Sequence, residues 1–375
     1  MIKLFTNKKN ITFILKKETI CLITGGRWHY GAYNFLSENH FEIVILDDNK
    51  NCYLKKTFKN TKIDKLKNIS KYKNLFFWSP CNDLGAHLAD KMNNKKFFVR
   101  TKNFMFSNNK KKISQELKIS KLLVKKINKN KNYIKKPIFG SGSKGISIYN
   151  GKNLINKNKY FLQELILGNE ISVEIYSFKG KHKILSISLR ILKGFKSAVC
   201  IINLDINSKL KNIIKKKINQ YYKKLGVING ISHLEAIIDK QNRFYPIDIN
   251  LRMGGAGVSD YLIKETISND PFELDFNTLK YNFKAKKLAQ VKYGMIVYEY
   301  LNNNYLKNNL ENYSKLGKHV KLLPKSQITR FEVDKNRLSM LFIKKKNLKQ
   351  IINSIKFIFQ SNKAREIISK INTLS

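Results

Sequence analysis

The sequence has few cysteines and no long apolar run. Cys21, Cys52, Cys81 and Cys200 lie far apart, and no two of them form a CxxC pair. This spacing argues against a zinc site and favours free thiols in a reducing cytosol. No apolar run approaches the ~18 residues that a membrane helix needs, and no cleavage-site pattern follows the basic N-terminus. We therefore expect a cytoplasmic protein without a membrane partner.

Acidic residues are also scarce, at 26 Asp and Glu against 73 Lys and Arg, which gives a formal net charge of +47. Such a field can attract nucleic acid or an anionic membrane. The lysines, however, are spread along the chain among many Asn and Ile residues, and A/T-rich codons specify all three. Arginine is scarce, and there is no zinc-finger, basic-zipper or RNP-type motif. A basic nucleic-acid-binding protein stays open as an alternative, but we expect no specific nucleic-acid partner.

The first hundred residues have an α/β pattern. At 375 residues and 42% hydrophobic content, the chain is long and apolar enough for two or three packed units. Apolar runs at 18–24, 41–46 and 74–78 predict strands, and helical material between them predicts a parallel sheet. The glycines of GGRWHYG, which follow the first strand, lack the full dinucleotide fingerprint. Residues 79–83, SPCND, form a loop at a strand's C-terminal end, where substrate contacts are common.

A glycine-rich loop lies between two predicted strands at 133–136 and 146–149. The residues from Gly140 to Gly145 read GSGSKG. Its amide groups, its serine hydroxyls and Lys144 suit a polyphosphate. The order GxxxxGK[ST] is missing and a strand follows, so this is not a Walker loop. A flexible surface hairpin explains the loop equally well.

Helices and further strands flank this loop. A cap at 107–109 precedes KKKISQELKISKLLVKK, which predicts a helix over 110–126. Residues 160–178 predict two strands on either side of Gly168, interrupted by Gln163, Glu164, Glu170 and Glu174. These polar side chains suit adenine and ribose, or they form the wet face of an ordinary sheet. A basic helix over 209–225 ends at Gly226.

The stretch from Gly230 to Gly257 has the strongest period-two alternation. It predicts two strands joined by a polar turn at 239–242, with paired residue numbers that sum to about 481. With this pairing, the polar side chains of the two strands share one face of the hairpin: His233, Glu235, Asp248, Asn250 and Arg252. Two carboxylates and an amide suit Mg²⁺, and an adjacent arginine suits phosphate. The alternative is an amphipathic hairpin whose polar side faces water.

The remaining residues predict a smaller α+β unit. Strands are expected near 291–298 and 338–343, followed by a basic amphipathic helix over 348–359, and an Asn- and Lys-rich connector at 302–318 is a plausible boundary. We predict three domains, at 1–100, 101–284 and 285–375.

Taken in order, three motifs resemble the ATP-grasp superfamily, in the subgroup of the carbamoyl phosphate synthetase large subunit, biotin carboxylase and amino-acid ligases. They are Lys136-Pro137 with GSGSKG, then QELILGNE, then HLE followed by DINLRMGG. The resemblance covers nearly the whole chain. It implies α/β and α+β architecture, with a Rossmann-like pre-ATP-grasp domain followed by a two-lobed ATP-grasp fold.

The resemblance also implies a role for each matching residue. ATP would be bound by Lys110, Lys136, Ser141, Gly142, Ser143, Gln163, Glu164, Ile166 and Glu170, with Mg²⁺, or Mn²⁺, on Glu235, Asp248 and Asn250. Arg252 and Arg190 would stabilise the transferred phosphoryl group or an acyl phosphate. Asp248 stands where most relatives have Glu, and Gln163 stands where many have Glu.

The implied activity is an ATP-dependent ligase that joins a small carboxylate to an amine through an acyl phosphate. This chemistry needs positioning and charge neutralisation rather than a nucleophilic side chain. The absence of a convincing Ser-His-Asp or Cys-His arrangement agrees with it. A catalytically weak ATP-binding partner subunit is the alternative that the Asp248 and Gln163 departures favour. A homodimer is a possible assembly.

Overall fold

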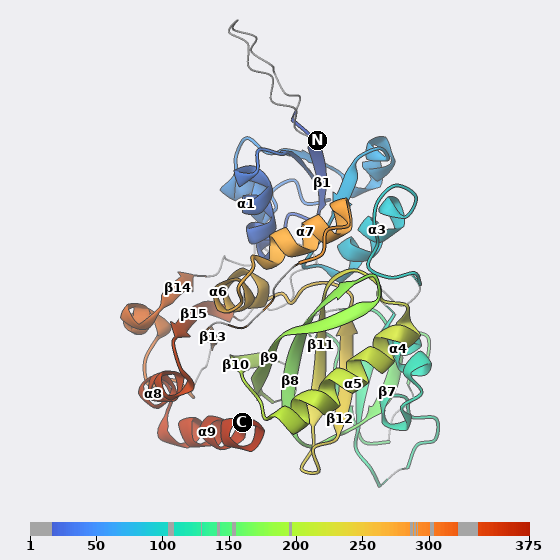
Figure 1. Cartoon of the computed structure of the whole chain (residues 1–375). Helices are drawn as coiled ribbons and strands as arrows, with labels where there is room; N and C mark the ends of the chain where they lie inside the picture. Colours follow the sequence, from blue (N-terminus) through green and yellow to red (C-terminus); the bar gives the residue numbers. More distant parts are fainter. Residues whose placement is uncertain are drawn as a thin grey trace, which may run out of the picture.

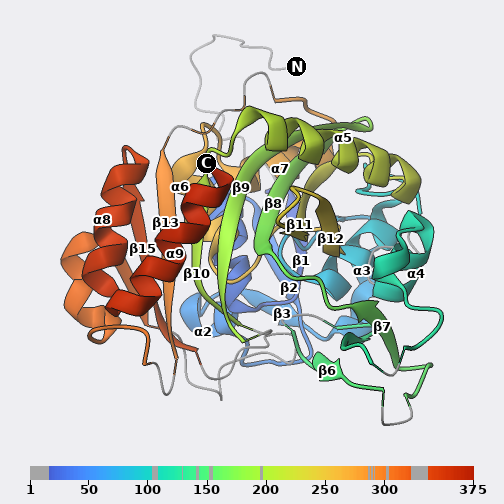
Figure 2. The same ribbon diagram turned by 90° about the horizontal axis from the view of Figure 1, so that it is seen from below.

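The computed structural model describes residues 17–103, 109–128, 130–140, 143–151, 155–194, 197–285, 288, 290, 292–300, 304–321 and 337–375. Over these residues the chain forms three β-sheets, with helices packed around them (Figures 1 and 2). The α-helices in these ranges are α1 Tyr30–Glu38, α2 Tyr53–Thr57, α3 Asp83–Asn93, α4 Lys110–Leu117, α5 Ser208–Leu225, α6 Lys264–Thr266, α7 Pro271–Tyr281, α8 Leu348–Ile358 and α9 Ser361–Leu374. Within the described residues, no helix combines the length and the apolar character needed to cross a membrane.

The N-terminal sheet is parallel and four-stranded, in the order β3-β2-β1-β4. Its strands are β1 Thr19–Ile23, β2 Glu42–Leu46, β3 Lys62–Asp64 and β4 Phe76–Trp78. The three apolar strands confirm the expected α/β layer, whereas β3 is too short and too charged for its sequence to predict. In the glycine turn after β1, the Gly25 amide donates to the Asp47 carboxylate at 2.8 Å. The Gly25 amide of this turn is therefore already hydrogen-bonded within the protein.

The largest sheet is antiparallel and has eight strands, in the order β12-β11-β8-β9-β10-β13-β15-β14. The strands are β8 Asn169–Phe178, β9 Lys181–Lys193, β10 Ser197–Leu204, β11 Gly230–Ile238, β12 Phe244–Asn250, β13 Tyr293–Tyr300, β14 Lys318–Lys321 and β15 Arg337–Lys345. Helix α5 lies across one face of the sheet, with Ile214, Ile218 and Tyr222 buried beneath it (Figure 1). Strands β13 to β15 continue this sheet, and the predicted division at 285 stays a prediction.

The third sheet is small and antiparallel, in the order β6-β5-β7. It consists of β5 Tyr133–Pro137, β6 Ser147–Tyr149 and β7 Tyr160–Glu164. Asn109 caps α4, as expected, by accepting from the Lys112 amide at 2.9 Å. The prediction of one helix to residue 126 is wrong, because α4 ends at Leu117 and the next residue is left-handed. Beyond it, the Val124 amide donates to Leu162 at 3.0 Å, so the chain runs beside β7 instead.

The β11–β12 hairpin has a register that differs from the expected one. Glu235 lies opposite Asp248 and His233 lies opposite Asn250, so the paired numbers sum to 483 rather than 481. Beyond a shift between Glu235 and Ala236, the sum falls to 482, because Ile247 is the extra residue of a β-bulge. Both the predicted sum and the sum beside the site are odd. The shared face of Glu235 and Asp248 is therefore confirmed, although the predicted pairs are wrong.

Candidate active site

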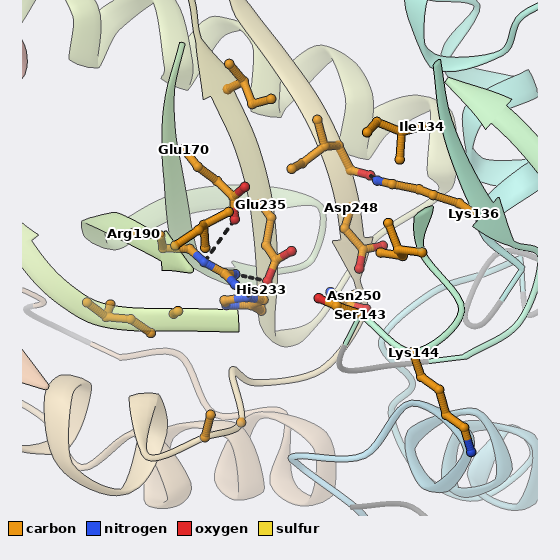
Figure 3. A pocket seen from close by; sticks show the side chains of 18 of the residues that line it. Ile134, Lys136, Ser143, Lys144, Glu170, Arg190, His233, Glu235, Asp248 and Asn250 are labelled. Atoms are coloured by element: carbon orange, nitrogen blue, oxygen red, sulfur yellow. Dashed lines mark hydrogen bonds and ion pairs between the residues drawn. The ribbon is translucent and has the colours of Figure 1, made fainter. Parts of the chain in front are cut away.

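A cavity of about 520 Å³ lies where the small sheet faces the polar side of the large sheet. Its walls come from β5 and β7, from β8 to β12, from the loop after β4 and from the chain after β12. Figure 3 shows Lys136, Glu170, Arg190, Glu235 and Asp248 converging on this space from different strands. Residues far apart in the sequence thus form one site.

Two carboxylates lie side by side on the cavity floor. Glu235 and Asp248 occupy opposing positions of β11 and β12, and Asn250 lies one pleat further along the same face. Their oxygens are the donors that a hard divalent cation prefers. In the described ranges, no group of three or more His, Cys, Asp and Glu side chains gathers as a metal site. Two carboxylates and an amide therefore fit a cation that takes its other ligands from phosphates and water.

Two lysines flank Asp248. The ammonium group of Lys110 contacts its carboxylate, and Lys136 donates to the Ile247 carbonyl at 2.7 Å. Burial lowers the pKa of Lys136 to about 8, although the charge of Asp248 opposes this effect. Burial alone would raise the pKa of Asp248, but Lys110 and Lys136 outweigh it and hold that pKa at about 2. The site thus keeps an ionised carboxylate between two cations.

Arg190 of β9 bridges the two ends of the cavity floor. Its guanidinium contacts Glu235, and its Nε lies 3.2 Å from Glu170 Oε1 (Figure 3). The family resemblance implied that Arg190 contacts the phosphoryl group and Glu170 the ribose, and both side chains line the same cavity. Arg190 is therefore near the metal-ligand candidates as well as the predicted ribose site.

Arg252 is held by a residue of the N-terminal region. Its Nε and Nη2 donate to the two carboxylate oxygens of Asp83, at 2.8 and 3.2 Å, and its Nη1 donates to the Met253 carbonyl at 2.8 Å. Burial would lower the pKa of Arg252, but Asp83 outweighs it and raises that pKa. The sequence pointed to the loop at 79–83 but gave no sign that Asp83 pairs with Arg252, because 169 residues separate them.

A buried hydrogen-bonded network of His233 and Glu174 contacts Glu235. His233 Nδ1 contacts Glu174, and His233 Nε2 lies 3.3 Å from Glu235 Oε1. The other oxygen of Glu174 accepts from the Gly254 amide at 3.3 Å. Glu174 is 2% exposed. The sequence grouped Glu174 with side chains that suit adenine and ribose or form the solvent-facing side of a sheet, and it gave no sign of the contact with His233.

The predicted adenine wall and glycine loop also reach the cavity. Gln163, Glu164 and Ile166 line it, and Gln163 donates to Ser114 at 3.4 Å. Ser143 and Lys144 line it too, although the Lys144 side chain extends away from the carboxylates in Figure 3. The predicted Ser141 and Gly142 lie outside the described residues. Every other predicted site residue lines this cavity.

Comparisons with known proteins agree with this architecture. Residues 124–260 match the family model described as ATP-grasp domain. A comparison with curated proteins found no match.

Solved structures resemble the chain over most of its length. The L-amino acid ligase from Bacillus licheniformis is 13% identical, with 90% of this chain and 96% of that one covered and a TM-score of 0.69. The N5-carboxyaminoimidazole synthetase from Staphylococcus aureus complexed with ADP is 13% identical, with coverages of 90% and 96% and a TM-score of 0.71. The biotin carboxylase from Campylobacter jejuni is 12% identical, with both coverages at 90% and a TM-score of 0.63. These similarities show a shared fold.

Proposed function

We propose that this chain, an ATP-grasp protein by its domain at 124–260 and by its overall fold, is an ATP-dependent ligase that joins a small carboxylate to an amine. The observation that supports the proposal best is the cavity floor, where Glu235, Asp248 and Asn250 lie among Lys110, Lys136 and Arg190. Oxygen ligands beside converging cations suit the phosphates of Mg-ATP.

In the proposed reaction, a carboxylate oxygen of the substrate attacks the γ-phosphorus of ATP, and the bond to ADP breaks. The amine nitrogen then attacks the acyl carbon, phosphate leaves with the bonding electron pair, and the nitrogen loses a proton. Lys110 and Lys136 would neutralise the phosphates, while Arg190 and Arg252 would stabilise the charge that is transferred. Glu235, Asp248 and Asn250 would hold Mg²⁺ or Mn²⁺, which would offset the negative charge of the ATP phosphates.

The nucleotide would lie with its base against the segment from Gln163 to Ile166. Gln163 and Glu164 are polar, whereas Leu165 and Ile166 are apolar, so this wall offers both kinds of surface. Glu170 would accept from the ribose hydroxyls, and Ser141 to Ser143 would close over the phosphates. In this arrangement the γ-phosphate points toward Arg252 and the loop at 79–83, where the carboxylate substrate would bind.

Calorimetry with Mg-ATP tests the nucleotide site. We expect the wild-type protein to bind Mg-ATP at or below millimolar concentration, and Lys136→Met to weaken binding at least tenfold because it removes a phosphate-facing charge. Asp205→Asn is the matched control, since Asp205 is an exposed partner of Lys211 outside the cavity. A folded wild-type protein that fails to bind Mg-ATP at this concentration would refute the proposal.

A catalytically weak ATP-binding subunit is the second candidate. The family resemblance implies a glutamate at position 248. Asp248 favours this candidate because its side chain is one methylene shorter, which changes how far the carboxylate reaches toward a metal ion. This candidate predicts Mg-ATP binding without turnover in any pool of carboxylates and amines.

We also place the protein in the cytoplasm, since its four cysteines are free and buried. Light scattering would show whether it forms a homodimer.

A further inference from the structure

The loop at 79–83, which follows β4, packs against the segment that follows β12 at the cavity floor. The Met253 amide donates to the Pro80 carbonyl at 2.7 Å, directly beside the Asp83 contact with Arg252. Asn82 caps α3 by accepting from the Gly85 amide at 2.8 Å, so Asp83 stands at the first helical position. The main chain is therefore fixed on both sides of Asp83, by helix α3 after it and by the docked loop before it.

The hydrogen bonds of Arg252 leave a defined part of its guanidinium for a ligand. A guanidinium has five N–H groups in a rigid plane. Asp83 accepts from Nε and from one N–H of Nη2, and the Met253 carbonyl accepts from one N–H of Nη1. One N–H on each terminal nitrogen remains, and both Arg252 and Asp83 line the cavity. Because the plane is fixed by two parallel bonds, these two N–H groups have a fixed direction.

A second arginine pair in the molecule shows what a purely structural contact looks like. Arg100 donates to Asp275 at 2.6 Å, and Asp275 also accepts from Trp78 Nε1 and from the Ile231 amide. The side chains of Arg100 and Asp275 are 2% and 0% exposed, and neither lines the cavity. Asp83 and Arg252, at 16% and 12%, are instead open to the cavity, and Arg252 has donors to spare.

We propose that Asp83 is a positioning residue that orients Arg252 toward the phosphoryl group and the acyl phosphate. The role rests on the proposed function. The N-terminal region would thus contribute to catalysis by aiming a cation that belongs to the ATP-grasp domain. Asp83 also neutralises Arg252, so the pair offers directed hydrogen bonds without adding net positive charge to the cavity.

Kinetics of Asp83→Asn test this role against a merely structural one. An amide cannot accept two parallel bonds as a carboxylate does, so the guanidinium loses its fixed plane. We expect kcat for ADP formation to fall about 10- to 100-fold, as small misplacements do, with KM for ATP unchanged within about twofold. Asp83→Glu should recover part of kcat. Asp205→Asn should leave kcat unchanged. A kcat for Asp83→Asn equal to that of Asp205→Asn would overturn the proposal.

A spectroscopic measurement makes the test independent of turnover. The sequence has eight arginines, so ¹⁵N-arginine labelling gives few Nε–H signals, and Arg252→Lys assigns one of them. We expect the Arg252 signal to be downfield and slow to exchange, and to lose both properties in Asp83→Asn but not in Asp275→Asn. Asp275→Asn should lower the melting temperature instead. An unchanged Arg252 signal in Asp83→Asn would refute the positioning role even if no substrate is found. Failure of Mg-ATP binding would refute the proposed function alone.

Discussion

The ammonium group of Lys110 contacts the carboxylate of Asp248, and so a proposed phosphate ligand and a proposed metal ligand are paired with each other. The second carboxylate of the site, Glu235, is paired in the same way with Arg190. Each cation occupies one oxygen of its carboxylate, Oδ2 of Asp248 or Oε1 of Glu235, and therefore competes with a metal ion for that oxygen. The phosphates of ATP offer the two cations an alternative partner, which links metal binding to nucleotide binding.

We therefore expect Mn²⁺ to bind far more weakly alone than with ATP. Titration followed by electron paramagnetic resonance should show at least a tenfold gain in Mn²⁺ affinity when ATP is present. Lys110→Met should raise the affinity for Mn²⁺ alone, because it frees Asp248 without removing a metal ligand. Lys112→Met is the control, since Lys112 does not line the cavity. Tight Mn²⁺ binding to the wild-type protein without nucleotide would contradict the coupling.

The pKa of Lys136 gives ATP binding a pH dependence. Its value of about 8 lies below the ordinary 10.5, because burial disfavours the charged form. Only the charged form neutralises phosphate, so ATP affinity should fall as pH rises through the pKa of Lys136, by up to about tenfold per unit for one proton. Calorimetry between pH 6.5 and 9.5 would measure this slope. Lys136→Arg stays charged and should flatten it, and an unchanged slope in that variant would rule out Lys136 as its cause.

The same pKa has a consequence for stability. Between about pH 8 and 10.5, the unfolded chain holds a proton on Lys136 that the folded protein has released. The unfolded state binds more protons there, so this group makes folding more favourable as pH rises through that range. Below pH 8, the folded protein carries the buried charge and this contribution is lost. Denaturation in urea at pH 7.5 and 9.5 should show a smaller pH-dependent gain in Lys136→Met than in the wild type.

Two neighbouring glycines should respond differently to alanine. A Cβ on Gly254 would lie 2.6 Å from Glu174 Oε1 and 3.0 Å from His233 Nδ1, whereas a Cβ on Gly255 would lie 3.7 Å from the Trp28 ring. Gly254→Ala should cost about 1–3 kcal/mol of unfolding free energy, as overpacking does, while Gly255→Ala should cost less than about 0.5 kcal/mol, because ordinary contact remains. Urea denaturation would measure both. Equal losses would show that the Glu174–His233 chain does not restrict this loop.

Much of this site could be predicted from the sequence, because period-two alternation fixes which side chains share a face. Glu235, Asp248 and Asn250 were placed together in this way, and the resemblance supplied Lys110 and Lys136. The β-bulge at Ile247 could not be predicted, since a one-residue insertion leaves the alternation on either side intact. Nor could the Asp83 contact with Arg252, because it depends on how the N-terminal region docks.

Asp248 is the residue on which full activity should depend most. Asp248→Asn keeps the shape of the side chain but removes the charge that Lys110 and Lys136 share and that the proposed metal ion would use. We expect kcat for ADP formation to fall at least 100-fold. Asp248→Glu introduces the glutamate that the family resemblance implies at this position and should retain activity within about tenfold. Because the pKa of Asp248 is held at about 2, neither limb of the pH profile between 6 and 9 should arise from it.

ADP release is the measurement that tests the central claim most directly. The wild-type protein and Glu235→Ala would be incubated with Mg-ATP and a pool of small carboxylates and amines, and the products would be analysed by mass. The account predicts ADP release by the wild-type protein together with a new amide, and the loss of both in Glu235→Ala. ADP release by the wild-type protein no greater than that by Glu235→Ala, in folded protein that binds Mg-ATP, would contradict it.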